Sequence, residues 1–582
     1  MNSETKAHST SSVSSTHSLN SVSPTCKSCK NEFVIEPDDF GFYETIHVPP
    51  PTWCPRCRLM RRLSWQGYRI LYKKKCDFTG EMLITTHHPD SPYKIYRQDI
   101  WWSDKWDPKS YGRDYDFSRS FFEQFAELKR ETPLPSLYTD YVSMSNSDYC
   151  NAASGLKNCY LAFRITGGEN SAYVNQIVDI KDSFDVSFAN FCELSYDSAK
   201  VNKCYKSFYS QDCDDCNDVW FSYDLVGCQN CIGCINLRNK SYHIFNKPCS
   251  KEDYEKFKEN LDLGSWENVQ KFRQEVRSFI VKEPRREFHG RKNQNVSGEY
   301  ILNSKNALDC YMVANAEDLR YCHLLKNGPA AKSYDWTIFG DGGEWIYDSC
   351  WTGLNANNNK FGIWNYSAHD IEYCFGCHSS GNLFGCVGIR KGEYCILNKQ
   401  YGKGEYKDTV EKIKKQMMEV PYTDKLGREY RYGEYFPPEL STWTYNESTA
   451  YEWFPLKKEE AIGQGFLWRD KDEREYQEAT TGMPDHIKDV NDEILNEILK
   501  CHSCGKNYKI IQMELNFYRK FEIPLPRVCP LCRDRDRIKR LSPMAETFDR
   551  NCKKCGKDIK TPYSSERPEI IYCEDCYAKE VV

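Results

Sequence analysis

The most regular hydrophobic pattern in the chain lies between about residues 145 and 224. Short segments there alternate large apolar or cysteine residues with small polar ones. They begin at Asn158, Ser171, Ser183, Cys192, Lys203 and Asn217. Asn, Asp, Ser or Gly bounds each segment, a pattern that predicts short β-strands joined by tight turns. Two segments per coil predict a coil of about 22 residues, the scale of a parallel β-solenoid. An antiparallel sandwich is the alternative, although Asn-Gly and Asp-Gly hairpin signals are scarce.

A second copy of this unit follows the first. The stretch GCINLRNKSYHIFNK at 233–247 matches GCVGIRKGEYCILNK at 385–399 with a constant offset (385 − 233 = 152). Upstream, Tyr196 and Asp197 match Tyr347 and Asp348 with a slip of one residue. A register kept over about sixty residues identifies a duplication. The fold class predicted is therefore mainly β with helices, with a duplicated β-solenoid-like body.

Helical spacing appears at the edges of these units. Each β-unit should end in a capping helix, at about 251–280 and 405–418. In the aromatic stretch before the first unit, Phe121, Phe125 and Leu128 predict a helix that Pro133 stops. Between 485 and 500, Ile487 and Ile494 belong to one apolar helical face, which predicts a helix leading into the next cysteine module.

Cysteine modules flank the duplicated body. Two of them have a pair of CxxC motifs at the same spacing (54 − 29 = 25 and 529 − 504 = 25), and in both the second motif is CPxCR followed by a basic Arg-Leu-Ser segment. A third module has a shorter spacing (573 − 555 = 18). Paired CxxC turns present four thiolates to one tetrahedral zinc ion, and such closed sites are structural. The predicted ligands of three zinc ions are Cys26, Cys29, Cys54 and Cys57; Cys501, Cys504, Cys529 and Cys532; and Cys552, Cys555, Cys573 and Cys576.

Composition favours metal over disulfides for these cysteines. The chain has 582 residues, 30 of them cysteine, and the stretch 1–24 is Ser- and Thr-rich without the apolar core of a signal peptide. We therefore expect a reducing, cytoplasmic location. The net charge of −5 argues against a surface that tracks nucleic acid along its whole length. No apolar run approaches the roughly 18 residues of a membrane span.

The cysteines of the first β-unit form a separate question. Cys213, Cys216, Cys228, Cys231 and Cys234 have spacings that a further metal or an iron–sulfur cluster could use. In the duplicate, however, serine and leucine replace two of them, at positions 380 and 383. Such exchange favours small buried fillers and leaves a further metal as the alternative.

Arginines cluster beside the first two modules. They are Arg56, Arg58, Arg61 and Arg62 after the first, and Arg533, Arg535 and Arg537 after the second. These residues are candidates for contact with nucleic acid or another partner. A solvated charged face is the simpler interpretation, since Asp534 and Asp536 interrupt the second cluster.

Catalytic motifs are scarce. The chain has no P-loop, dinucleotide fingerprint, HExxH motif or nucleophile elbow, so we predict no catalytic residue and no organic cofactor. Asp335, Glu344 and Asp348 lie beside tryptophans and could act as a carboxylate pair on a glycoside. Because Glu193 and Asp197 match the last two in the other unit, a structural role is simpler.

Several of these motifs occur together in one family. The combination of CPRCRLMRRLSW, KNCYLAF, GCINLRNKSYHIFNK and FPPEL with CPLCR resembles a family of uncharacterised zinc-ribbon, Cys/Tyr-rich repeat proteins from small-genome bacteria. Members are sometimes labelled as CaiB/BaiF-type CoA-transferases, but the residues here do not support that label. The resemblance implies no activity.

These observations favour a zinc-binding, non-enzymatic scaffold that contacts a macromolecule, protein or nucleic acid, through its ribbons. A carbohydrate- or nucleic-acid-processing enzyme on the β-body and a nucleic-acid-binding protein using the arginines are the alternatives. We expect no membrane contact and no small-molecule substrate. The predicted organisation is a tail (1–24), zinc ribbon 1 (25–75), an aromatic connector with a helix (76–144), β-units with capping helices (145–285 and 286–420), a Pro/Tyr-rich connector (421–484), a helix with zinc ribbon 2 (485–545) and zinc ribbon 3 (546–582).

Overall fold

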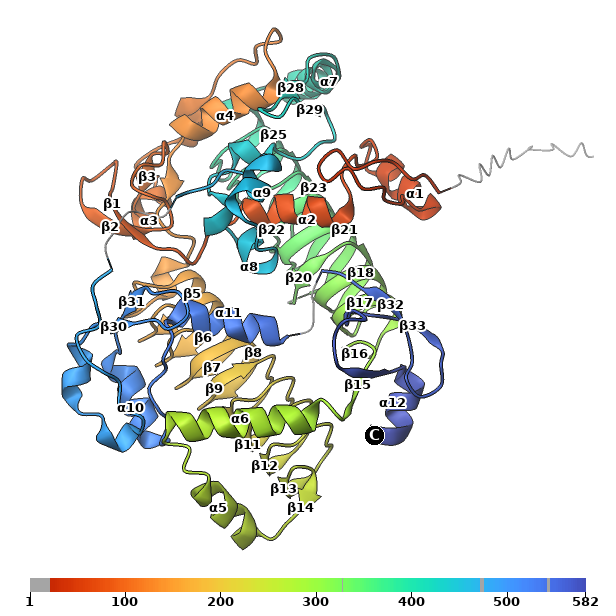
Figure 1. The fold of residues 1–582 in the computed structure, drawn as a ribbon. Helices are drawn as coiled ribbons and strands as arrows, with labels where there is room; N and C mark the ends of the chain where they lie inside the picture. The colour runs from red at the N-terminus through yellow and green to blue at the C-terminus, as the bar shows by residue number, and fades with distance from the viewer. Residues whose placement is uncertain (1–20, 327, 471–475, 542–544, 582) are drawn as a thin grey trace, which may run out of the picture.

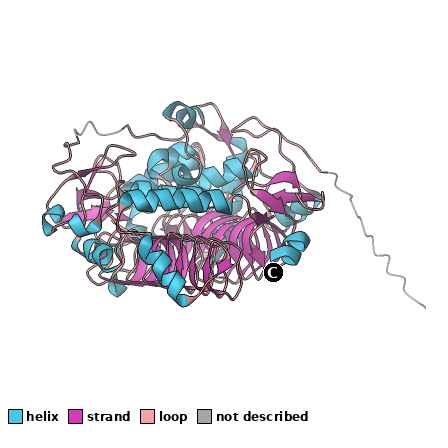
Figure 2. Cartoon of the chain, turned by 60° about the horizontal axis from the view of Figure 1, so that its bottom comes forward, coloured by secondary structure: helices cyan, strands magenta, loops and turns pink. Residues whose placement is uncertain are grey.

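The fold is mainly β with helices, and two large parallel sheets form its centre (Figure 1). The computed structural model describes residues 21–326, 328–470, 476–541 and 545–581. The tail predicted for 1–24 falls almost wholly outside these ranges. Cysteine modules and helices pack around the two sheets, and Figure 2 shows the strands stacked in rows with helices lying across them.

The first sheet has ten strands in chain order, so each strand pairs with the next one along the chain. Asn151 pairs with Phe163, Phe163 with Asn175 and Asn175 with Ser187, at a constant step (163 − 151 = 12). This repeat is shorter than the predicted coil of about 22 residues. The strands are β5 (Asn151–Lys157), β6 (Phe163–Glu169), β7 (Asn175–Lys181), β8 (Phe184–Glu193), β9 (Tyr196–Ala199), β10 (Tyr205–Phe208), β11 (Asn217–Trp220), β12 (Gln229–Ile232), β13 (Ser241–Ile244) and the antiparallel β14 (Lys247–Pro248).

The second sheet has twelve strands and a similar step. Asn357 pairs with His369, His369 with Gly381 and Gly381 with Glu393. The strands are β16 (Gly290–Arg291), β17 (Gln294–Leu302), β18 (Lys305–Ala314), β19 (Ala316–Arg320), β20 (His323–Leu325), β21 (Ala330–Phe339), β22 (Gly343–Thr352), β23 (Asn357–Lys360), β24 (His369–Glu372), β25 (Gly381–Phe384), β26 (Glu393–Ile396) and β27 (Lys399–Gln400).

A left-handed backbone conformation recurs at every third residue of the two β-units. Asn158, Leu161 and Arg164 have φ angles of 52°, 47° and 50°, and the pattern continues along both units. The left-handed conformation costs an L-residue about 1 kcal/mol or more, so interactions between successive repeats must offset it. Backbone hydrogen bonds between successive repeats do so, and side chains also contribute: Asn158 Nδ2 donates to Asn170 Oδ1 over 3.1 Å.

Helices follow the last strands of each sheet, in the stretches where we expect capping helices. The first cap is two helices, α5 (Lys251–Asn260) and α6 (Trp266–Ile280), and the second is α7 (Lys403–Glu419). Ser250 caps α5 by accepting a hydrogen bond from the N–H of Asp253. The aromatic helix is α4 (Phe121–Glu131). The helix predicted for 485–500 is absent among the described residues: short 3-10 turns, η5 (Ile487–Asp489) and η6 (Asp492–Leu495), bury the same apolar residues instead.

Short elements build the remaining modules. Those of the N-terminal third are α1 (Pro37–Thr45), α2 (Pro55–Ser64), β1 (Tyr72–Lys75), β2 (Met82–Thr85), β3 (Ile95–Tyr96), α3 (Gln98–Trp101), η1 (Pro108–Tyr111), β4 (Leu134–Pro135) and η2 (Tyr141–Ser143). The others are β15 (Pro284–Arg286), β28 (Tyr422–Thr423), β29 (Glu429–Tyr430), η3 (Pro438–Leu440), η4 (Tyr445–Glu447), α8 (Thr449–Trp453), α9 (Lys458–Gly463), β30 (Leu499–Lys500), β31 (Asn507–Tyr508), α10 (Gln512–Lys520), α11 (Pro530–Arg540), β32 (Phe548–Asn551), β33 (Asp558–Thr561), β34 (Ile570–Tyr572) and α12 (Glu574–Val581).

Candidate metal centres

All twelve predicted ligands gather into the three expected groups of four cysteines. Within each group the sulfur atoms lie within 4.8 Å of one another. In each group one distance joins a sulfur of the first CxxC motif to a sulfur of the second. It is 3.8 Å between Cys29 and Cys54, 3.8 Å between Cys504 and Cys529, and 3.7 Å between Cys555 and Cys573. A tetrahedral ion with metal–sulfur bonds of about 2.3 Å places its sulfurs about 3.8 Å apart. The three groups therefore fit a tetrathiolate metal ion.

The backbone of each module supports negative charge on the first sulfur. The N–H of Cys54 donates to Cys26 Sγ over 3.2 Å. The N–H groups of Cys529 and Cys573 donate in the same way, over 3.2 Å, to Cys501 and Cys552. Burial raises the pKa of the Cys501 and Cys552 thiols, but N–H donors outweigh it and lower the pKa to about 7 and about 6. These sulfurs are therefore prepared to bind a cation as thiolates.

In ribbons 1 and 2 the second of the two CxxC motifs begins a helix, so the metal ligands and the helix form one structural unit. Cys54 and Cys529 are the N-caps of α2 and α11, and proline follows each at the first helical position. Proline suits this position because its fixed φ matches the helix and it needs no N–H partner there. The positive end of the helix also favours nearby thiolates.

The helix of ribbon 1, α2, lies on the second sheet (Figure 1). It buries Arg58, Arg61 and Arg62. Arg58 and Arg62 each approach Asp335 to 2.9 Å, and Arg61 and Arg62 each approach Asp348 to 2.8 Å. All five side chains are at most 2% exposed. These arginines thus form ion pairs inside the chain, with carboxylates that come from a distant part of the sequence.

The helix of ribbon 2 lies on the first sheet in the same manner. Arg533 and Arg537 pair with Asp185 over 2.6 and 2.8 Å, and Arg540 pairs with Asp197 over 2.5 Å. Asp185 and Asp197 precede Asp335 and Asp348 by nearly the duplication offset (335 − 185 = 150; 348 − 197 = 151). Each ribbon helix therefore docks on an equivalent surface, ribbon 1 on the second unit and ribbon 2 on the first.

Hydroxyl groups complete this equivalence. Arg62 Nε donates to Thr337 Oγ1 over 2.9 Å, and Arg537 Nε donates to Ser187 Oγ over 3.0 Å. Burial alone raises the pKa of Asp335, but the charges of Arg58 and Arg62 more than compensate and hold it below its usual range. The sequence analysis did not single out Asp185, although it did name the matching residue of the second unit, Asp335.

The other arginines proposed for partner contact lie nearer the surface. Arg56 is exposed and pairs with Glu546. Arg535 is half-buried, with its guanidinium 5.4 Å from the centre of the Tyr451 ring. Of the seven arginines, these two retain the most accessible positions.

The cysteines inside the β-units are buried and recur at matching positions of successive repeats. Cys192, Cys204, Cys216 and Cys228 recur at a constant interval (204 − 192 = 12; 228 − 216 = 12) and form one column, each at most 3% exposed. Their thiols contact backbone carbonyls; Cys216 Sγ donates to the carbonyl of Asp214 over 3.3 Å. In the described part of the chain, no group with metal-ligand geometry includes Cys213, Cys216, Cys228, Cys231 or Cys234.

We accordingly expect Cys216→Ala to leave the metal content of the chain unchanged. Because the substitution removes only one buried sulfur atom, the free energy of unfolding should fall by about 1 kcal/mol. Elemental analysis and a thermal melt measure both effects, with Cys532→Ala, which should remove one ion, as the control. Loss of an ion in Cys216→Ala would assign a metal to the coil interior.

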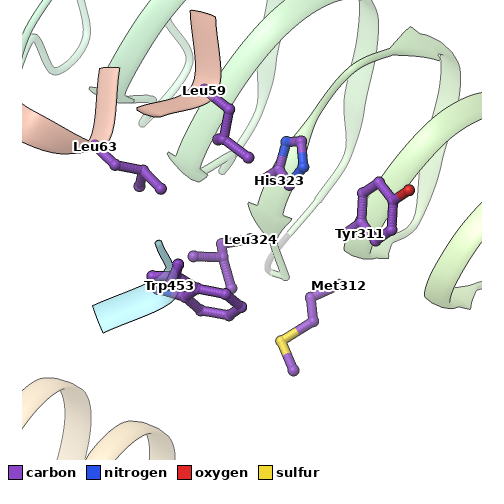
Figure 3. A pocket seen from close by; sticks show the side chains of 7 residues that line it. All are labelled: Leu59, Leu63, Tyr311, Met312, His323, Leu324 and Trp453. Atoms are coloured by element: carbon purple, nitrogen blue, oxygen red, sulfur yellow. The ribbon is translucent and has the colours of Figure 1, made fainter. Parts of the chain in front are cut away.

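An apolar pocket lies where ribbon 1 meets the second sheet (Figure 3). It is lined by Leu59, Leu63, Tyr311, Met312, His323, Leu324 and Trp453. Its volume of about 10 Å³ suits about one water molecule. Burial lowers the pKa of His323 to about 3, and Arg62 adds to this effect, so the imidazole is neutral at physiological pH. The pocket is too small and too apolar for a substrate.

A larger polar hollow lies at the start of the second unit, along four successive segments of the sheet (292–294, 303–305, 315–317 and 329–331). Its volume is about 490 Å³, and Asn303, Asn315 and Lys292 are among its lining residues. Glu317 is the acidic residue of the lining and pairs with Lys305 over 2.8 Å. The hollow therefore lacks the converging carboxylates that glycoside hydrolysis requires.

Comparison with known proteins gives no family. No family model and no curated protein matches the chain. A solved structure described as a "putative acetyltransferase from Desulfovibrio desulfuricans G20" covers 51% of this chain and 76% of its own, with 10% identity and a TM-score of 0.11. A likeness at that level supports no conclusion about fold or activity. Among the described residues, no helix is long and apolar enough to cross a membrane.

Proposed function

We propose that the protein is a zinc-binding, non-enzymatic scaffold. In it, zinc ribbons pack against a duplicated β-solenoid with short parallel coils. The observation that carries the proposal is the spacing of the sulfur atoms, which suits a tetrahedral ion at each of three places. Four thiolates in tetrahedral geometry suit zinc and disfavour the hard cations Mg²⁺ and Ca²⁺. A closed set of four protein ligands leaves no coordination position for a substrate.

The arrangement of charge supports a structural role. The carboxylates that could serve catalysis, Asp335 and Asp348, are buried against arginines. The same pairing occupies Arg58, Arg61 and Arg62, so phosphate contact through these residues is disfavoured. The scaffold contacts its macromolecular partner through its ribbons, where Arg56 keeps an exposed side chain.

Cobalt substitution tests the proposal. Growth with Co²⁺ should give a protein with the intense sulfur-to-cobalt charge-transfer bands and visible bands of tetrahedral tetrathiolate sites. Since these sites are closed, azide or cyanide should leave the spectrum unchanged. A spectrum that shifts on addition of azide would reveal an open, catalytic type of site and contradict the proposal.

A further inference from the structure

The hairpin β1–β2, with β3 and α3, repeats the architecture of ribbon 3. In ribbon 3 a hairpin (β32–β33), a short strand (β34) and a helix (α12) follow one another. Each hairpin pairs over four residues, Tyr72–Lys75 with Met82–Thr85 and Phe548–Asn551 with Asp558–Thr561. Each short strand also pairs, in parallel, with the strand before a β-unit: β3 with β4 and β34 with β15.

The knuckle at Cys76 has the backbone hydrogen bonds of the metal-binding knuckle at Cys552. In both, the cysteine N–H bonds to the carbonyl five residues later, and its carbonyl accepts from a left-handed glycine four residues later. A sulfur of each knuckle also accepts a backbone N–H from the second knuckle: Cys76 Sγ from Arg97 over 3.3 Å, and Cys552 Sγ from Cys573 over 3.2 Å. The two segments thus share the fold that positions four ligands.

The sequences align with one constant offset (552 − 76 = 476; 573 − 97 = 476). IYRQDIW at 95–101 faces IYCEDCY at 571–577. At the ligand positions, Cys552 faces Cys76, whereas Thr79, Arg97 and Ile100 face the other three cysteines of ribbon 3. The two ribbon pairs at the ends of the chain are also spaced alike (76 − 26 = 50; 552 − 501 = 51). The duplication therefore includes both ribbons of each pair.

Ion pairs join the two knuckles of the metal-free module. Arg97 pairs with Glu81 of the first knuckle and, over 2.6 Å, with Asp99 of the second, so it joins the two knuckles. These groups are exposed, and such pairs contribute little to stability. Burial of Ile100, which is 2% exposed, and Trp101, which is 1% exposed, contributes more.

We propose that residues 72–101 are a fourth zinc ribbon whose metal site has lost three of its four ligands, and that an arginine bridge and buried apolar side chains hold it together. The inference rests on the proposed zinc ribbons. In the native chain Cys76 is the one ligand that remains, and it does not bind a zinc ion by itself. The module should bind a divalent ion such as zinc once the other three ligands are restored. The native chain consequently binds three ions and not four.

Restoring the three ligands tests this inference. The triple variant T79C/R97C/I100C should bind four zinc ions per chain by elemental analysis, and its cobalt form should absorb about one-third more than the native form. The matched variant T79S/R97K/I100V should keep three. A triple variant that folds with native circular dichroism but still binds three ions would overturn the inference.

The reciprocal change in ribbon 3 keeps the test decisive if the triple variant does not fold. The variant C555T/K557E/C573R/C576I gives ribbon 3 the residues of the metal-free module. It should lose one ion, from three to two, while the β32–β33 hairpin keeps its protection from hydrogen exchange. Loss of that protection would overturn the inference. A native chain without zinc would instead contradict the proposed function, so the two failures are distinguishable.

Discussion

Asp335→Ala should lower the free energy of unfolding by about 3 to 5 kcal/mol. The substitution leaves Arg58 without its carboxylate partner and removes one of the two partners of Arg62, both at full burial. A buried charge without its partner destabilises a protein by about that amount. Urea unfolding followed by tryptophan fluorescence measures the change, since Trp53 and Trp336 are buried near this site.

A matched control lies in the same strand. Lys332 pairs with Glu344 over 2.7 Å at the surface of β21 and β22. Lys332→Ala should therefore leave the free energy of unfolding nearly unchanged. Equal effects of Asp335→Ala and Lys332→Ala would contradict the claim that the buried arginine cluster stabilises the fold more than a surface ion pair does. On the first sheet, Asp185→Ala should match Asp335→Ala, because Arg533 and Arg537 depend on it.

Removal of the ion from ribbon 1 should have the largest effect. Zinc binding contributes on the order of 10 kcal/mol to the folding of such modules. Cys57→Ser should abolish the site and release α2, so hydrogen exchange should become fast over 26–64. Exchange should also increase in β21 and β22, where Asp335 and Asp348 lose their partners.

The control for this experiment is ribbon 3. Its metal ligands and its hairpin lie in a separate module, so protection of β32 and β33 should be unchanged in Cys57→Ser. Mass spectrometry of the exchanged protein resolves the segments. Slow exchange of residues 26–64 in a variant that has lost its ion would show that ribbon 1 folds without metal.

The metal groups could be predicted from sequence because their signal is local. Two knuckles at a fixed spacing define four ligands whatever surrounds them, and all twelve cysteines meet as expected. The duplication could also be predicted, because it appears as a constant offset between matching residues. The 12-residue step between paired strands could not be predicted. Residues such as Leu161 and Tyr173 are left-handed there, although their side chains carry no turn signal.

The burial of the arginines depended on tertiary contacts that no local pattern contains. The basic residues around Arg62 predict that it lies on the surface of a helix. It is buried because it pairs with Asp335 and Asp348, which lie in a different unit. The apolar pattern near Ile487 correctly predicted which residues are buried, but it wrongly predicted an α-helix. Asn491 caps a short 3-10 turn there, and the chain does not continue as an α-helix.

The metal content of the native protein tests the central claim most directly. Protein purified without added metal or chelator should contain three zinc ions per chain by elemental analysis, and single serine substitutions at Cys29, Cys504 and Cys555 should each reduce the number to two. A native chain with no bound zinc, or one in which these substitutions leave the number unchanged, would contradict it.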